Sequence, residues 1–508
     1  MSGRVHKSII NAEVNLLFYF LSLFFAFFSR KIFLDNLSAE FIGLTGTLGN
    51  ILGYLNLAEL GIGSCVSFFL YKPLQTGDRE KMQEILSVFG YLYHCIGMII
   101  LGAGVVISLF FPLIFGGEKL GMPIIYFTFY SFLCSSLISY FINYRQILLQ
   151  ADQKNYLVAI YFQSAGLVKV AVQIFLAYRY HNPYAWVAVE FVFGIFACVV
   201  LNHKIDKEYP WLKTDKKRGR GLLKKYPGIL TNTRQIFIHK IKDFVLSKSD
   251  ELFIFAFVSL KMVAYYGNYI MITSKITLLF TSALDSVNAG VGNLVAEGRK
   301  DNIMKVFWEL MTIRHFVAGL LCFSIYYGIE PFVSLWLGDK YIMSHDILVL
   351  LVIYIYMINS RGVVDIFNHS YGLYADVWSA WAELAINITI TIVGGWMYGI
   401  IGILLGKIVS VFLIVVFWKP YYLFTSGLKQ PVAHYWTGAV RYYAVFGVAF
   451  AAGTLATRIV TIIPFEGYLS WIAYMLVCAS VFIVVEIAGL LLFAKGARDC
   501  VRRIKIFK

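Results

Sequence analysis

The sequence predicts an all-α polytopic membrane protein with about 14 transmembrane helices. Its 508 residues are 59% hydrophobic and 14% charged, whereas roughly a quarter of the residues of a soluble domain are charged. The mean hydropathy is +0.72, and long apolar runs recur from Ala12 to Phe493. Helices are expected because backbone groups inside a bilayer must be hydrogen-bonded within their own segment.

The apolar runs divide into individual spans when about 20 residues are allotted to each. The expected helices are 12–34, 41–70, 85–111, 120–149, 156–178, 184–203, 229–258, 262–293, 303–328, 344–372, 376–397, 400–418, 436–460 and 467–494. Only Gly399 and Gly402 separate the pair at 376–418. The first segment does not read as a cleavable signal peptide, because it continues through Arg30 without a small-residue cleavage site.

Basic residues gather in connections that lie on one side of the membrane if the N-terminus is cytoplasmic. Nine Lys and Arg residues fall in 204–225 and six in the tail after residue 494. The positive-inside rule makes this side cytoplasmic, and an even number of spans places both termini there. The formal charge of +15 therefore follows topology, and no nucleic-acid partner is expected. The basic connection suits either anionic lipid headgroups or a purely topogenic linker.

Two short matches indicate an internal repeat. The stretch 77–82 matches 300–305, and Ala151-Asp152 matches Ala375-Asp376 at nearly the same spacing. Six expected spans separate the copies, so the repeat is parallel, with an axis along the membrane normal. The expected division is an N-terminal six-helix lobe (1–203), a basic linker (204–228), a C-terminal six-helix lobe (229–420), and two further helices with a basic tail (421–508).

Catalytic and metal chemistry find little support. The seven cysteines are scattered and odd in number, which gives neither a disulfide framework nor a metal-ligand spacing. The connections on the side opposite the basic loops are too short for a large catalytic site. We expect no enzyme and no cofactor, apart from coupling to H⁺ or Na⁺.

Five segments of the chain together resemble one known family. They are Asn56-Leu57-Ala58-Glu59-Leu60-Gly61-Ile62-Gly63, Leu70-Tyr71-Lys72-Pro73-Leu74, Gly77-Asp78, His239-Lys240-Ile241 through Ser249-Asp250, and Tyr266-Gly267-Asn268-Tyr269. The family that they resemble is the Wzx-type polysaccharide flippases of the multidrug/oligosaccharidyl-lipid/polysaccharide exporter superfamily. The resemblance extends over nearly the whole chain through its span count, repeat and linker. It implies a flippase that moves undecaprenyl-diphosphate-linked oligosaccharide across the bacterial inner membrane for O-antigen, capsule or exopolysaccharide assembly. A polysaccharide polymerase and chain-length machinery are the implied partners.

Cations within the apolar segments are the candidate ligands of a diphosphate. Charged groups inside a membrane protein face its interior or a water-filled cavity, since exposure to lipid is costly. The candidates for a cation-lined cavity are Arg30, Lys169, Lys240, Lys248, Lys275 and Arg361. All but Lys248 have a plainer alternative: Arg30 snorkels to the interface, Lys169 and Lys275 pair with buried acids, and Lys240 lies on an amphipathic cytoplasmic extension. Arg361 with Asp365 has the spacing of an intrahelical ion pair.

Acidic residues in the spans are candidates for ion coupling. They are Glu59, Asp250 and Asp365. The resemblance points to Glu59, which could equally anchor a kink beside Gly61 and Gly63. We therefore expect alternating access through a cavity between two lobes. The alternatives are an ion-coupled drug or organic-cation antiporter of the same superfamily and a membrane polysaccharide polymerase or ligase.

Overall fold

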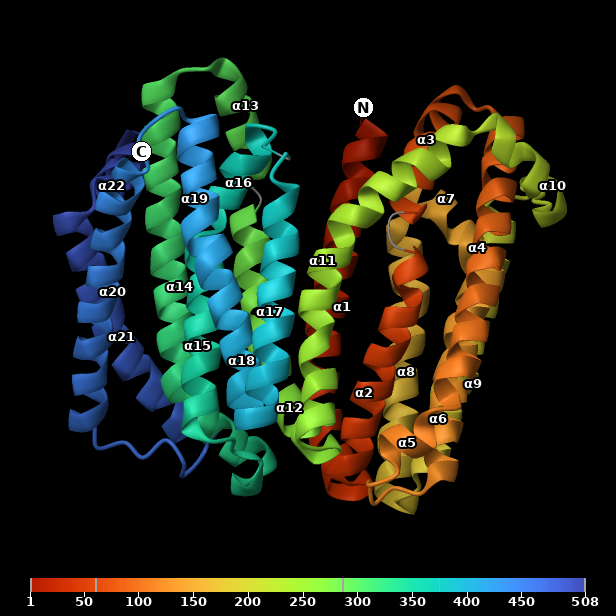
Figure 1. Ribbon diagram of the computed structural model, residues 1–508, viewed down its shortest axis with the longest axis horizontal. Helices are drawn as coiled ribbons and strands as arrows, with labels where there is room; N and C mark the ends of the chain where they lie inside the picture. Colours follow the sequence, from red (N-terminus) through yellow and green to blue (C-terminus); the bar gives the residue numbers. More distant parts are fainter. Residues whose placement is uncertain (1, 60–61, 286, 374, 507–508) are drawn as a thin grey trace. The chain divides into compact units, whose positions relative to one another are not determined.

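The computed structural model describes residues 2–59, 62–285, 287–373 and 375–506. Some side chains within these ranges lie outside the description, namely those of 2–9, 12, 58, 64, 231–232, 234–240, 242–243, 247, 282–283, 285, 289 and 504–506. All regular elements of the described residues are helices (Figure 1). Eleven of the described helices are long and apolar enough to cross a membrane, so the predicted fold class is confirmed while the count of 14 is approximate.

The described chain forms two compact units. Unit 1 comprises Met1–Phe255 with Ser259–Ala264, and unit 2 comprises Ala256–Val258 with Tyr265–Lys508. This division falls later in the chain than the expected linker at 204–228. The assignment of 1–203 and 229–420 to two functional lobes stays a prediction.

Unit 1 is a helical bundle in which two of the predicted spans, 41–70 and 120–149, are each broken into two helices. Its helices are α1 (Ser2–Leu37), α2 (Ala39–Leu55), α3 (Ile62–Thr76), α4 (Arg79–Ser108), α5 (Phe111–Phe115), α6 (Met122–Ile142), α7 (Gln146–Ala151), α8 (Asn155–Tyr180), α9 (Pro183–Glu208), α10 (Lys216–Leu222) and most of α11 (Pro227–Phe257). The predicted helix 41–70 is broken by a 3-10 turn at Asn56–Glu59. This turn separates α2 from α3.

The basic connection after α9 is ordered against unit 1. Helix α10 packs along α4, and Lys216 Nζ donates to the Phe141 carbonyl at 2.6 Å and lies over the Tyr144 ring. Burial, together with the nearby charge of Arg145, lowers the pKa of Lys216. Part of the predicted topogenic loop is therefore a docked structural element.

Unit 2 holds the remaining helices, among them a C-terminal helix where the sequence predicts a basic tail. Its helices are α12 (Leu260–Asp285, whose first turn belongs to unit 1), α13 (Asn288–Glu297), α14 (Lys300–Leu337), α15 (His345–Ser360), α16 (Gly362–Ser370), α17 (Val377–Tyr398), α18 (Ile400–Ser410) with a π-helical continuation Val411–Trp418, α19 (Lys419–Tyr422), α20 (Ala433–Ile459), α21 (Tyr468–Phe493) and α22 (Lys495–Ile506). A buried cluster including Phe307, Phe367 and Phe424 joins α14, α16 and the segment after α19. Helices α13, α16 and α22 lie at the same end of unit 2 (Figure 1).

The predicted boundary between α17 and α18 is confirmed. Gly399 has a φ of +59°, a backbone conformation that glycine adopts without a steric penalty. Gly394 and Gly402 then pack backbone to backbone across the hairpin. Any side chain at Gly402 would collide with the Gly394 carbonyl.

A four-residue pattern, Ile-Asn-x-Arg, recurs at two helix breaks. Ile142-Asn143-Tyr144-Arg145 joins α6 to α7, and Ile358-Asn359-Ser360-Arg361 joins α15 to α16. A 3-10 turn interrupts the helix at the first place, and Arg361 leaves the helical conformation at the second. The two arginines have different surroundings.

Candidate anion-binding site

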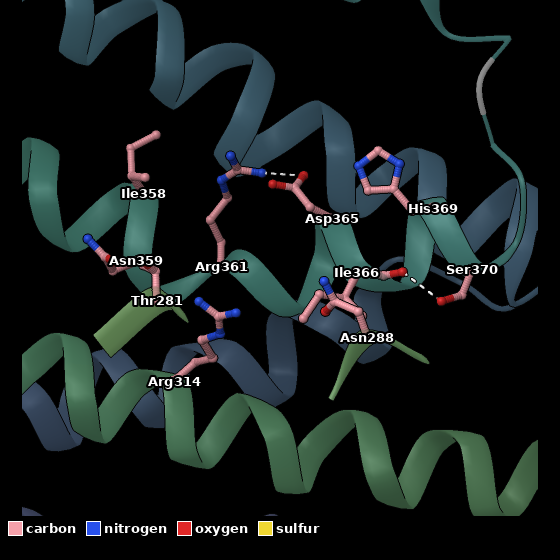
Figure 2. Close-up of a pocket in the computed structure, with 11 residues that line it drawn as sticks. Thr281, Asn288, Arg314, Ile358, Asn359, Arg361, Asp365, Ile366, His369 and Ser370 are labelled. Carbon is pink, nitrogen blue, oxygen red and sulfur yellow. Dashed lines mark hydrogen bonds and ion pairs between the residues drawn. The ribbon is translucent and has the colours of Figure 1, made fainter. Parts of the chain in front are cut away.

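A polar pocket of about 530 Å³ lies within unit 2 (Figure 2). Its polar lining comes from α12, α13, α14 and the α15–α16 junction. The lining residues are Thr281, Asn288, Arg314, Ile358, Asn359, Arg361, Gly362, Asp365, Ile366, His369 and Ser370. The pocket combines two arginines with one carboxylate, so it carries net positive charge.

Arg361 stands at the break between α15 and α16. Its φ and ψ of −96° and 0° are not helical, and this local turn directs its side chain to the pocket. Nη1 donates to Asp365 Oδ1 at 2.6 Å, the intrahelical pair that the spacing predicts. Only 8% of Arg361 is exposed, and among the described residues its Nε has no hydrogen-bond partner. The guanidinium therefore keeps donor capacity that Asp365 does not use.

Arg314 reaches the same pocket from α14. It is 5% exposed, and its guanidinium lies against the backbone of Gly362, where an added Cβ would be 2.9 Å from Nη1. Figure 2 shows the two guanidiniums on either side of the α15–α16 junction. The two arginines outnumber the single carboxylate of Asp365 among the lining residues, and this excess of positive charge favours an anionic ligand.

The neutral polar residues complete an anion site. Asn359, Asn288, Thr281 and Ser370 supply amide and hydroxyl groups, and His369 adds a ring that can donate from either nitrogen when protonated. Planar guanidiniums bind phosphate oxygens through paired hydrogen bonds, which gives both energy and geometry. The arrangement suits a phosphate or diphosphate.

A second charged cluster lies within unit 1, where α1, α2 and α11 meet. Arg30 Nη2 donates to the Ala264 carbonyl at 2.9 Å, and Asn50 Nδ2 donates to Glu251 Oε2 at 2.5 Å. The charges of Arg30, Lys248 and Asp250 all act on the Glu251 carboxylate. Three expected site residues are thus brought together around an acid that was not among the candidates.

Two other candidates have structural partners in unit 1. Lys169 Nζ binds Glu190 Oε1 at 2.6 Å, and Gln173 Nε2 donates to Glu190 Oε2 at 3.0 Å, so this lysine joins α8 to α9. Glu59 accepts hydrogen bonds from the hydroxyl groups of Tyr93 at 2.7 Å and Tyr140 at 2.5 Å. Both contacts fit the plainer alternatives, a buried ion pair and an anchored break.

The last two candidates are less informative. Lys275 is half-buried on α12 and is not among the residues that line the pocket. The side chain of Lys240 lies outside the described part of α11. Arg314 was missed by the sequence analysis, although a charge inside the predicted span 303–328 was a usable signal.

Comparison with solved structures shows the fold. No family model matches this sequence, and no curated protein matches it. The structure of the lipid II flippase MurJ in an inward closed conformation is similar over 97% of this chain and 100% of that chain, with a TM-score of 0.66 and 15% identity. An inward-facing multidrug resistance MATE family transporter of the MOP superfamily is similar over 81% of this chain and 95% of that one, with a TM-score of 0.57 and 14% identity. The chain therefore has the membrane-transporter fold that MurJ and the MATE transporter share.

Proposed function

We propose that this protein is a flippase for lipid-linked oligosaccharides whose headgroup is a diphosphate. The observation that carries the proposal is the pocket that Arg314 and Arg361 line together with amide and hydroxyl groups. The fold shared with a lipid II flippase, over 97% of this chain and 100% of that chain, supports the same class of cargo.

The pocket chemistry explains why a diphosphate needs a protein to cross the membrane. A diphosphate is strongly hydrated, and hydrocarbon offers it neither charge nor hydrogen bonds. Buried arginines replace water with fixed donors, in a surrounding of lower dielectric where each contact is stronger. The isoprenoid tail stays in lipid while the headgroup and glycan pass through the protein by alternating access.

Export of drugs or organic cations is the alternative, because a MATE transporter shares the fold. A cationic cargo would be favoured by an acidic pocket, and the pocket in unit 2 has two arginines against the single carboxylate of Asp365. The Arg30–Lys248–Asp250–Glu251 cluster is of mixed sign. The balance of charge therefore favours an anion.

The remaining parts of the proposal extend the expectations from the basic connections and from the resemblance to polysaccharide flippases. The protein would lie in the bacterial inner membrane with both termini cytoplasmic, as the basic connections require. The cargo would be undecaprenyl-diphosphate-linked glycan for O-antigen, capsule or exopolysaccharide, with a polymerase and chain-length machinery acting after it. Transport would involve no covalent chemistry and would draw on H⁺ or Na⁺.

Reconstitution tests the function. Proteoliposomes carrying fluorescent undecaprenyl-diphosphate oligosaccharide would be mixed with a membrane-impermeant quencher, and the rate at which inner-leaflet label becomes accessible would be measured. We expect wild-type protein to raise this rate and Arg361→Gln to abolish most of the increase. Arg458→Gln, which changes an exposed arginine at the end of α20, should behave as wild type. Translocation of an organic cation without any of the lipid would establish the alternative.

A further inference from the structure

An apolar groove of about 870 Å³ runs between α20 and α21 of unit 2. Arg441 of α20 and Arg498 of α22 are the charged residues of its lining, and the other lining residues are Val, Ala, Leu, Phe and Gly. A short connection joins the end of α20 to the start of α21, so the two helices are antiparallel. The two arginines therefore lie at the same end of the groove, where α20 begins and α21 ends.

The groove has the shape and depth for a flexible hydrocarbon chain. Its floor is narrow because Gly489 lets α21 approach α20, and an added Cβ there would lie 2.8 Å from Val445 Cγ1. Its rims include Val448 and Leu492, whose side chains are exposed. From Arg441 to Val448 the groove follows α20 for about 10 Å, which is most of the depth of one leaflet of a hydrocarbon core about 30 Å thick.

A smaller pocket of about 210 Å³ adjoins the charged end of the groove, and Arg441 lines both cavities. Helices α14, α20 and α22 enclose this pocket. An added Cβ at Gly438 or Gly496 would lie 2.1 or 2.2 Å from an atom of Trp308, so α20 and α22 both approach α14 closely there. The hydrogen-bonding and charged side chains of the lining include His434, Thr437, Arg441 and Lys495.

Positive charge dominates the junction of the two cavities. Neither lining contains a carboxylate, and Asp499, the acid of α22, is buried and outside both. Arg498 Nη1 donates to the carbonyl groups of Leu491 and Leu492 at 3.3 and 2.8 Å, which fixes this guanidinium at the end of α21 and leaves its other nitrogens available.

Arg441 is exposed although it belongs to a candidate membrane span, Ala433–Ile459. An arginine that faces hydrocarbon is costly, whereas an arginine that contacts a lipid phosphate is stabilised by paired hydrogen bonds. The junction therefore combines a place for a phosphate with an adjoining place for an acyl chain.

We propose that this junction binds one anionic phospholipid, with its phosphate between Arg441, Arg498 and Lys495 and an acyl chain in the α20–α21 groove. Basic pockets between membrane helices on the cytoplasmic side suit anionic headgroups, and the basic connections assign this end of unit 2 to the cytoplasm. A free phosphate would leave the apolar groove unused, so a lipid is the fitting ligand. The site shares no residue with the Arg314–Arg361 pocket and does not depend on the cargo.

Native mass spectrometry of the detergent-purified full-length protein tests the headgroup. The protein would be titrated with dioleoyl phosphatidylglycerol, which is anionic, or with dioleoyl phosphatidylcholine, which has the same chains and no net charge. We expect the wild type to bind one phosphatidylglycerol on the order of tenfold more tightly than phosphatidylcholine. Arg441→Gln should weaken phosphatidylglycerol binding about fivefold. Arg502→Gln, which removes an exposed charge of α22 outside both linings, should not change it.

Equal binding of the two lipids, or equal losses in Arg441→Gln and Arg502→Gln, would overturn the headgroup site. The comparison of the two lipids needs only the wild type, so it decides the matter even if a variant does not fold.

The acyl chain is tested by filling the groove. Ala488 is exposed within the groove, so Ala488→Phe adds bulk there without entering the core and should weaken binding of dioleoyl phosphatidylglycerol on the order of tenfold. Val477→Phe, at an exposed position of α21 outside the groove, is the control and should bind as the wild type does. Unchanged binding by Ala488→Phe would overturn the chain site, and displacement of phosphatidylglycerol by equimolar undecaprenyl phosphate would assign the groove to a prenyl lipid instead.

Discussion

Arg145 in unit 1 and Arg361 in unit 2 occupy matching places in the Ile-Asn-x-Arg pattern, yet their partners differ in kind. Arg145 Nη1 binds Asp206 Oδ1 at 2.6 Å and Nη2 binds Asn202 Oδ1 at 2.8 Å. Both partners come from a different helix, α9, and Asn202 also bonds to Asn143. In unit 1, side chains of α9 therefore form hydrogen bonds with the Asn and Arg side chains of the pattern.

In unit 2 the Asn and Arg side chains of the same pattern bond to groups a few residues away in the chain. Asn359 Nδ2 donates to the Ile355 carbonyl of its own helix at 2.8 Å, and Arg361 pairs with Asp365 one turn ahead. Among the described residues, no neighbouring helix provides Arg361 with hydrogen-bond partners in the way that α9 provides Asn202 and Asp206 to Arg145. The same local turn can therefore place one arginine in contact with a neighbouring helix and another at a pocket. Whether the neighbouring helix offers hydrogen-bond partners decides between the two roles.

The largest effect on transport is expected from Arg361→Gln. Removing a buried charge that contacts the ligand should reduce translocation on the order of 100-fold, whereas Arg361→Lys should keep part of it as a point charge. The readout is restoration of surface polysaccharide in a flippase-deleted bacterium at matched expression. If Arg361→Gln were as active as the wild type, Arg361 would not bind the cargo, and it would not differ in function from Arg145.

Gly362→Ala should have an intermediate effect. The new Cβ would lie 2.9 Å from Arg314 Nη1, which is closer than real Cβ atoms pack. The Arg314 side chain must therefore shift, and we expect the affinity for the anion to fall about tenfold. Gly290→Ala is the matched control, because an added Cβ there has no neighbour within 4 Å. Identical binding by both variants would mean that Arg314 does not contact the ligand.

Asp365→Asn should have the opposite effect and increase the affinity of the pocket for an anion. Losing the intrahelical competitor should raise the affinity of Arg361 for farnesyl diphosphate, a soluble short prenyl diphosphate, about threefold, because partly exposed pairs are weak; the Asp365 side chain is 41% exposed. Calorimetric titration would measure the change. A loss of affinity would indicate that Asp365 orients Arg361 more than it competes.

Arg145→Gln should have the smallest effect on transport. The Asp206 side chain is 59% exposed, so the pair contributes about 1 kcal/mol or less, and the expected result is a melting temperature lower by a few degrees. Transport per folded molecule should be unchanged. If Arg145→Gln instead abolished transport at normal stability, the two arginines would be functionally equivalent.

The sequence predicts the fold better than the site. Hydropathy and Gly399 were enough to place most of the helices approximately, because each is a local signal. The pairing of Arg361 with Asp365 followed from helical spacing in the same way. Lys169 could not be classified from sequence alone, because its partner Glu190 lies on another helix and only packing brings them together.

Arg314 shows why the pocket itself was not predictable. It lies more than forty positions before Arg361 in the chain, and its role depends on the close approach of α14 to Gly362. The groove between α20 and α21 was missed for a similar reason, because it exists only once the two helices are packed.

The central claim is that the diphosphate of the cargo binds between Arg314 and Arg361. A structure of the protein determined with bound farnesyl diphosphate tests it most directly. The account predicts phosphate density within hydrogen-bonding distance of both guanidiniums, with the Arg361–Asp365 pair opened or lengthened. Phosphate density at Arg30 and Lys248 in unit 1, with the unit 2 pocket empty, would contradict it.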